Sequence, residues 1–230
     1  MAGRPPKVDH VRDSFLREIS SARTLTSAIL ALPQKVNPAV DIGVHPKHTR
    51  QVVELAFMGI VAAWEEFLER SLVRYLAGAR TDSGYRPTHK FGQAKNINHA
   101  YEVLSQDPAY DPQKRYLKVT EPKWVWKSAD FFFRKHPYSC VRDKADLLKH
   151  ASSIRNRVAH SSEKCRADFK ATAVYFLQPP NATLTQGYGP GNLLLEPVRR
   201  HFGQKAVQRG DNHFHAYADL YEWLAKQIVP

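Results

Sequence analysis

The feature that most constrains the fold of this chain is a long apolar stretch with helical periodicity, from about Thr49 to Ala77. Its first half is apolar on almost every side, so a helix formed there has to be covered by other elements. We therefore expect a central core helix, capped at its C-terminal end by Gly78. The stripe that we expect to be buried consists of Phe57, Val61, Trp64, Leu68, Ser71, Leu72 and Tyr75.

Other parts of the chain also have helical patterns, most of them bounded by capping residues, proline or glycine. They extend from Val11 to about Leu32, from Ala94 to Leu104, from Ser139 to about His160 and from Asn212 to Ile228. A further helix is predicted from Ser161 to about Gln178, although residues 172–177 have the preferences of a strand. The predicted fold class is mainly α, a helical bundle of four to five helices with irregular insertions.

The length of 230 residues fits one well-buried domain with extensions. We expect a basic flexible tail at 1–10, a single helical domain at 11–230 and, within it, a loop-rich segment at about 179–210. The two cysteines are too few for a secreted disulfide scaffold, and no leader pattern opens the chain. The longest apolar run has ten residues, about half of what a bilayer-spanning helix needs. These features predict a cytoplasmic protein with no membrane partner.

The charge of the chain favours a polyanionic partner. Its net charge is +12, with a pI of about 9.7. Between Arg134 and Lys170 there are ten Lys or Arg residues and only four acids. Cations concentrated in this way neutralise phosphates and release counterions, which predicts nucleic acid as the partner. The alternative interpretation is a solvated basic face that serves solubility.

Aromatic residues alternate with cations in two short segments, Lys123–Lys127 and Phe131–Lys135. This composition is typical of a platform on which nucleic-acid bases stack. Burial of the same rings in the core is the competing interpretation, because most aromatic side chains are buried.

The segment Ile154–His160 carries the clearest chemical signal. Arg155 offers a planar, permanently charged fork that fits a phosphodiester, and His160 can take and give a proton near neutral pH. On a helix, Asn156 and His160 lie opposite a buried stripe, with Arg155 at the border of the two faces. The stripe consists of Cys140, Leu147, Ala151, Ile154 and Val158. The structural alternative is a histidine that interacts with the helix dipole and an arginine that pairs with Glu54 or Glu65.

The segment Arg155–His160 resembles the signature of the HEPN superfamily, which is Arg, a polar residue, three to five residues and then His at the end of a helix. Trp64–Leu68 is similar to a Glu-x-aromatic-aliphatic stretch in the first long core helix of many members. The resemblance covers roughly residues 45–178. It implies a helical bundle that forms a symmetric homodimer, whose two motifs share one cleft. Ser162 replaces a tyrosine that some members have two residues after the histidine, so we do not expect control by adenylylation of that tyrosine.

The resemblance implies a metal-independent RNA endonuclease that needs no cofactor, either a toxin or an antiviral defence effector. Catalysis would fall to Arg155, Asn156 and His160, and Glu65 would support Arg155. The residues that we expect to bind nucleic acid are Arg157, Lys149, Lys164, Arg166 and Arg142. Expected partners are RNA, a second copy of the chain and an antitoxin or regulatory protein. The alternative function is a non-catalytic module of the same family that binds RNA or a nucleotide or has a regulatory role.

Two histidine pairs, His45/His48 and His213/His215, have the close spacing of metal ligands. No cysteine or acid near either pair completes a zinc set of three or four ligands, so we predict no metal site.

Overall fold

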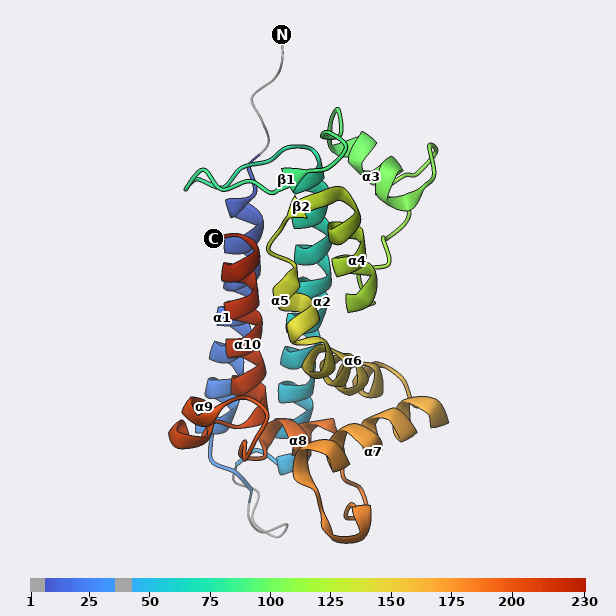
Figure 1. The fold of residues 1–230 in the computed structure, drawn as a ribbon. Coiled ribbons are helices and arrows are strands. Elements are labelled where there is room, and N and C mark those ends of the chain that lie inside the picture. The colour runs from blue at the N-terminus through green and yellow to red at the C-terminus, as the bar shows by residue number, and fades with distance from the viewer. Residues whose placement is uncertain (1–6, 36–42) are drawn as a thin grey trace. The chain divides into compact units, whose positions relative to one another are not determined.

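The computed structural model describes residues 7–35 and 43–230 (Figure 1). Residues 1–6 of the predicted tail lie outside this range. The fold is mainly helical, as predicted, and its only sheet among the described residues pairs β1 (Thr88–His89) with β2 (Phe133–Lys135). The α-helices are α1 Asp9–Ala31, α2 Pro46–Leu76, α3 Ile97–Ser105, α4 Pro122–Phe132, α5 Ser139–Asp143, α6 Ala145–Ala159, α7 Glu163–Leu177, α8 Pro190–Leu195, α9 Gln204–Arg209 and α10 His213–Ile228.

The chain forms two compact units, and neither is continuous in sequence. The first unit contains Met1–Arg17, Ala63–Leu148 and Glu222–Pro230. The second unit contains Glu18–Ala62 and Lys149–Tyr221. The single domain that we expected at 11–230 therefore stays a prediction.

The predicted core helix is α2, and all seven residues of its expected stripe are buried. Gly78 has a φ of +83°, which an L side chain rarely adopts. Its N–H donates to the Tyr75 carbonyl over 3.0 Å, and the N–H of Ala79 donates to the Arg74 carbonyl over 2.9 Å. This pair of bonds is a Schellman motif, so glycine ends the helix as the sequence predicted.

The first unit is built around aromatic rings and buried hydroxyl groups. Phe15 of α1 stacks on Phe67 of α2 with a centroid distance of 5.2 Å, and Trp64 stacks on the same ring at 5.4 Å. The Tyr75 hydroxyl donates to the Ile228 carbonyl over 2.9 Å, which ties the end of α10 to α2. Burying these rings supplies a large part of the hydrophobic stabilisation of the unit.

The second unit has its own aromatic core. Phe57 of α2, Tyr217 of α10 and Phe176 of α7 are all buried. Tyr217 lies edge-on to Phe57 at 5.3 Å and to Phe202 at 4.9 Å.

No helix of the described residues is both long and apolar enough to cross a membrane.

The predicted helix from Ser139 to His160 is divided into α5 and α6. Lys144 has non-helical dihedrals, a φ of −113° and a ψ of 15°, and its N–H donates to the Arg142 carbonyl. Ser139 is the first helical residue of α5, and its N-cap is Tyr138. The segment Glu163–Leu177 is a helix, which decides the choice between helix and strand that the sequence left open.

The segment that we expected to be rich in loops contains three short helices, the 3₁₀ turn η1 (Pro180–Ala182), α8 and α9. The backbone N–H of Gly191, in the first turn of α8, donates to a Glu54 carboxylate oxygen over 2.7 Å. A helix of six residues has too few internal bonds to form alone, so this contact with α2 helps to hold it.

Candidate functional site

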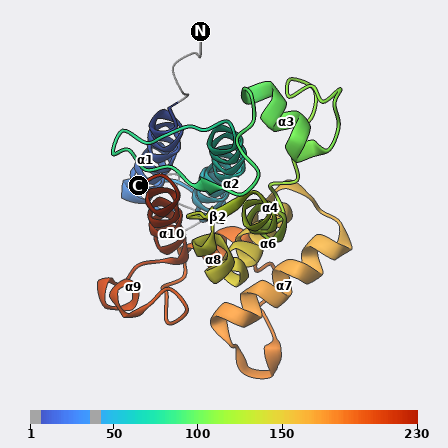
Figure 2. The ribbon, with the colours of Figure 1, turned by 45° about the horizontal axis from the view of Figure 1, so that its top comes forward.

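The motif residues lie at the end of α6 and just beyond it. Arg155 and Asn156 are half-buried in the last turns of the helix, which ends at Ala159, and His160 is the first residue after it and is exposed. The N–H of His160 donates to the Asn156 carbonyl over 2.9 Å and closes the last turn. The three residues 160–162 then lead into α7, as the views in Figures 1 and 2 show.

Arg155 and Asn156 interact directly. The Arg155 Nη1 donates to the Asn156 Oδ1 over 3.0 Å. Arg157 turns to the helix end instead, where its Nη1 donates to the His160 carbonyl over 3.2 Å. A guanidinium at this position satisfies a carbonyl that the helix leaves without an internal partner. Asn156, one of the three residues that we expected to be catalytic, thus contacts Arg155 through its amide oxygen.

The His160 ring is exposed and has no hydrogen-bond partner within residues 7–35 and 43–230. A general base needs access to the proton that it removes, and an exposed ring without an internal acceptor has that access. The end of α6 therefore presents an exposed imidazole at His160, five residues after a guanidinium that is bonded to Asn156.

The helix that carries the motif is anchored inside the second unit. Ala151 and Ile154 are fully buried. The His150 Nδ1 lies 2.9 Å from the hydroxyl of Thr172, and its ring stacks on Tyr175 at a centroid distance of 4.2 Å. Thr172 and Tyr175 belong to α7, so His150 connects α6, which carries the motif, with the helix that follows it. This role was not predicted from the sequence, although a histidine five residues before the motif arginine was a visible signal.

Exposed cations of the same unit lie on both sides of the motif in the sequence. Lys149, Lys164 and Arg166 are exposed, and none of them forms an ion pair with another described residue. Arg142 is also exposed, but it belongs to the first unit and lies 3.6 Å from the Asp143 carboxylate. Three uncommitted positive charges raise the local concentration of a polyanion.

Glu65, which we expected to support Arg155, is half-buried on α2. It belongs to the first unit, whereas Arg155 belongs to the second. The pairing of Glu65 with Arg155 stays a prediction.

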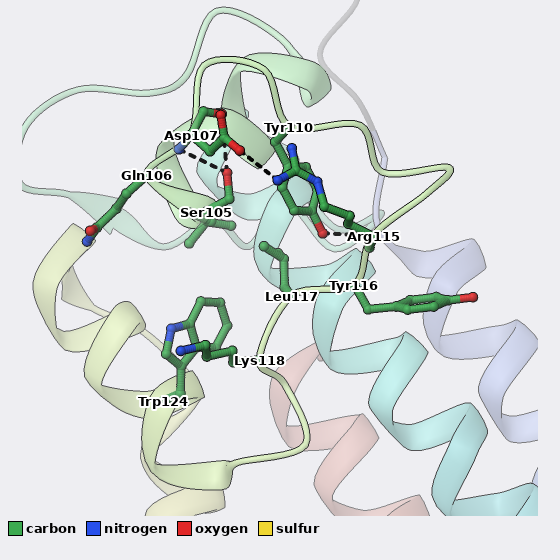
Figure 3. A pocket seen from close by; sticks show the side chains of 10 residues that line it. Ser105, Gln106, Asp107, Tyr110, Arg115, Tyr116, Leu117, Lys118 and Trp124 are labelled. Carbon is green, nitrogen blue, oxygen red and sulfur yellow. Dashed lines mark hydrogen bonds and ion pairs between the residues drawn. The ribbon is translucent and has the colours of Figure 1, made fainter.

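The first unit has a pocket that sequence analysis did not predict, shown in Figure 3. Its volume is about 610 Å³, and its lining comes from the end of α3, the following loop and the start of α4. Trp124 and Lys118 lie on one side, and Ser105, Asp107, Tyr110 and Arg115 lie on the other. The signal for it was the alternation of rings and cations at Lys123–Lys127, in which Val125 is buried and Trp124 and Trp126 are half-buried.

Among the described residues, no group of three or more His, Cys, Asp or Glu side chains is arranged to hold a metal ion. No family model matches the chain, and no curated protein and no solved structure matches it significantly.

Proposed function

We propose that the protein is a metal-independent RNA endonuclease whose active residues are Arg155, Asn156 and His160. The observation that carries this proposal is the order of groups at the end of α6, where a guanidinium held by Asn156 is followed by an exposed imidazole. The three uncommitted cations Lys149, Lys164 and Arg166 support a phosphate-rich substrate. The resemblance of Arg155–His160 to the HEPN signature supports the same activity.

His160 acts as the general base that removes the proton of a ribose 2′-hydroxyl. The 2′-oxygen attacks the adjacent phosphorus, the bond from phosphorus to the 5′-oxygen breaks, and the 5′-oxygen receives a proton. Arg155 stabilises the negative charge that develops on the phosphoryl oxygens. The products are a 2′,3′-cyclic phosphate and a 5′-hydroxyl.

The chain acts as a symmetric homodimer in this proposal. A twofold axis places two copies of the motif in one cleft, so one His160 serves as the base and the other as the acid. Cleavage therefore falls more steeply than linearly when the protein is diluted below the dissociation constant of the dimer. A toxin or antiviral defence role in the cytoplasm, held silent by an antitoxin or regulatory protein, fits such an enzyme.

The test compares the wild-type chain with His160→Ala and Arg155→Ala on structured and single-stranded RNA in the presence of EDTA. His48→Ala is the matched control, because His48 is also exposed and belongs to the same unit. We expect chelator-resistant cutting by the wild type and by the control, with cyclic phosphate ends, and none by the other two variants. Cutting by His160→Ala at the wild-type rate would refute the proposal.

A non-catalytic RNA-binding module is the second candidate function. The exposed cations Lys149, Lys164 and Arg166 favour it, since they bind phosphate whether or not His160 reacts. Equal retention of RNA by the wild type and His160→Ala, with no cutting by either, identifies this function.

A further inference from the structure

On one wall of the pocket in the first unit, the charged side chains already bond to neighbouring groups of the same wall. The Arg115 Nη1 donates to the Asp107 carboxylate over 2.7 Å, and its Nη2 donates to the Ala109 carbonyl over 2.9 Å. The same guanidinium lies 4.8 Å from the centroid of the Tyr110 ring. The N–H of Ala109 and the ion pair with Arg115 lower the pKa of Asp107, so its carboxylate stays ionised. This wall is preorganised, and its charges balance.

The segment that follows is fixed from beneath by Glu69. The N–H of Leu117 donates to one Glu69 carboxylate oxygen over 3.3 Å, and the Tyr101 hydroxyl donates to the other over 3.0 Å. Both Glu69 and Leu117 are buried. Lys118 follows Leu117 directly, so its backbone is held at the edge of the pocket while its side chain is exposed.

Three other lining side chains have hydrogen-bonding groups without protein partners. Within the described part of the chain, the Lys118 ammonium, the Gln106 amide and the indole N–H of Trp124 form no hydrogen bond or ion pair. Gln106 also has a left-handed backbone, with a φ of 58° and a ψ of 30°, which costs energy for a residue with a side chain. Trp124 is half-buried and stacks on no other ring of the described residues.

We propose that this pocket binds one nucleotide, with the base stacked on Trp124 and the phosphate bound by Lys118. The ring of Trp124 can stack on a flat base, and the Lys118 ammonium can pair with a phosphate. A nucleotide carries both a base and a phosphate. The Gln106 amide offers a donor and an acceptor to the edge of the base. The volume of about 610 Å³ lies within the usual range for small-molecule sites.

The inference does not rest on the proposed nuclease, because every residue that lines the pocket belongs to the first unit and the motif belongs to the second. The nucleotide is either free or one unit of an RNA strand. The probes that separate these sources are adenosine 5′-monophosphate and a short fluorescent oligoadenylate. Ribose 5-phosphate tests whether the base contributes.

The experiment uses the full chain with His160→Ala, which keeps the RNA intact, and measures binding by calorimetry for the nucleotide and by anisotropy for the oligomer. Trp124→Leu should weaken binding about tenfold or more, as loss of a base-stacking ring does. Lys118→Gln changes an exposed side chain and should weaken binding of adenosine 5′-monophosphate and of the oligoadenylate, because both carry phosphate. The matched control is Phe131→Leu, since Phe131 is an aromatic residue of the same helix, 59% exposed and outside the pocket.

Binding of either probe that depends on Trp124 and Lys118 but not on Phe131 supports the proposal. Equal affinity for the nucleotide and the oligomer identifies a free nucleotide as the ligand. A much higher affinity for the oligomer that Trp124→Leu removes identifies RNA. Ribose 5-phosphate binding as tightly as the nucleotide, an equal loss in the Phe131 variant or no binding of any probe would overturn it.

Discussion

The guanidinium of Arg155 donates a hydrogen bond to the side-chain oxygen of its neighbour Asn156, over 3.0 Å. Adjacent residues on a helix point about 100° apart, so this contact bends the arginine around the helix toward the side of Asn156. The polar residue after the arginine therefore positions the cation.

Asn156→Ala removes this contact and should lower RNA cleavage about tenfold to 100-fold, because a hydrogen bond to a charged group is worth about 1.5–3 kcal/mol. The measurement is the single-turnover cleavage rate. The control is Ser153→Ala, since the Ser153 hydroxyl donates only to the Lys149 carbonyl one turn earlier on the same helix. A rate for Asn156→Ala within about twofold of the control would show that Asn156 does not position Arg155 during cleavage.

Replacing Lys149, Lys164 and Arg166 by glutamine should reduce the salt dependence of RNA binding. Each phosphate contact on a single strand contributes about 0.7 to the slope of log Kd against log salt concentration, so three lost contacts lower the slope by about 2. The slope is measured by anisotropy on the His160→Ala background. Lys114→Gln is the control, because Lys114 is exposed but already lies 3.1 Å from the Asp111 carboxylate. An unchanged slope in the triple variant would show that these three cations do not contact the RNA phosphates.

Acidification should destabilise the fold through His213. The ring is buried, its Nδ1 lies 2.9 Å from the Glu196 carbonyl oxygen, and burial lowers the pKa of this histidine. The folded state thus binds fewer protons than the unfolded state. Stability is full at a pH above the ordinary histidine pKa of about 6.5 and falls as the pH decreases through it.

Urea unfolding at about pH 7.5 and about pH 5.5 measures this effect. His213→Gln keeps a hydrogen-bond donor but cannot be protonated in this range, so the difference between the two pH values should be smaller for the variant. His201 and His215, whose pKa values burial also lowers, should leave part of the dependence in place. An identical pH dependence for the wild type and the variant would contradict the prediction.

Two glycines of the second unit should respond to alanine in opposite directions. A Cβ at Gly191 would lie 2.6 Å from the Arg50 Cβ and 2.8 Å from the Arg50 carbonyl oxygen, so Gly191→Ala should cost about 1–3 kcal/mol. Gly59 is an exposed residue within α2 with nothing near its Cβ position. Gly59→Ala should raise the free energy of unfolding by about 0.5–1 kcal/mol, because alanine is the better helix former. Denaturant unfolding gives both values, and a loss of stability in Gly59→Ala would contradict this account.

Long elements were predictable from the sequence because many residues share one pattern. The stripe from Phe57 to Tyr75 and the glycine end of α2 are examples, and both are confirmed. The break at Lys144 was not predictable, since no proline or glycine lies between Ser139 and His160 to mark it. Helix α8 was missed for a different reason, because its first turn is satisfied by Glu54, which lies far away in the sequence.

The candidate sites also differ in how far the sequence could predict them. The motif at Arg155–His160 was readable because its chemistry lies within six consecutive residues. The pocket at Trp124 was not, because Gln106, Lys118 and Trp124 come from three places in an irregular segment. Only the structure shows that they line one space.

The composition of the two units has a consequence for anyone who wishes to study them separately. Helices α1, α2, α6 and α10 each contribute residues to both units, so no single stretch of the gene encodes either one. A truncation at any boundary between the two units therefore also removes residues that belong to the core of the unit that was to be kept. Fragments made by deletion or limited proteolysis should therefore lose the proposed RNA cleavage and the proposed nucleotide binding together, and point substitutions are the means to separate them.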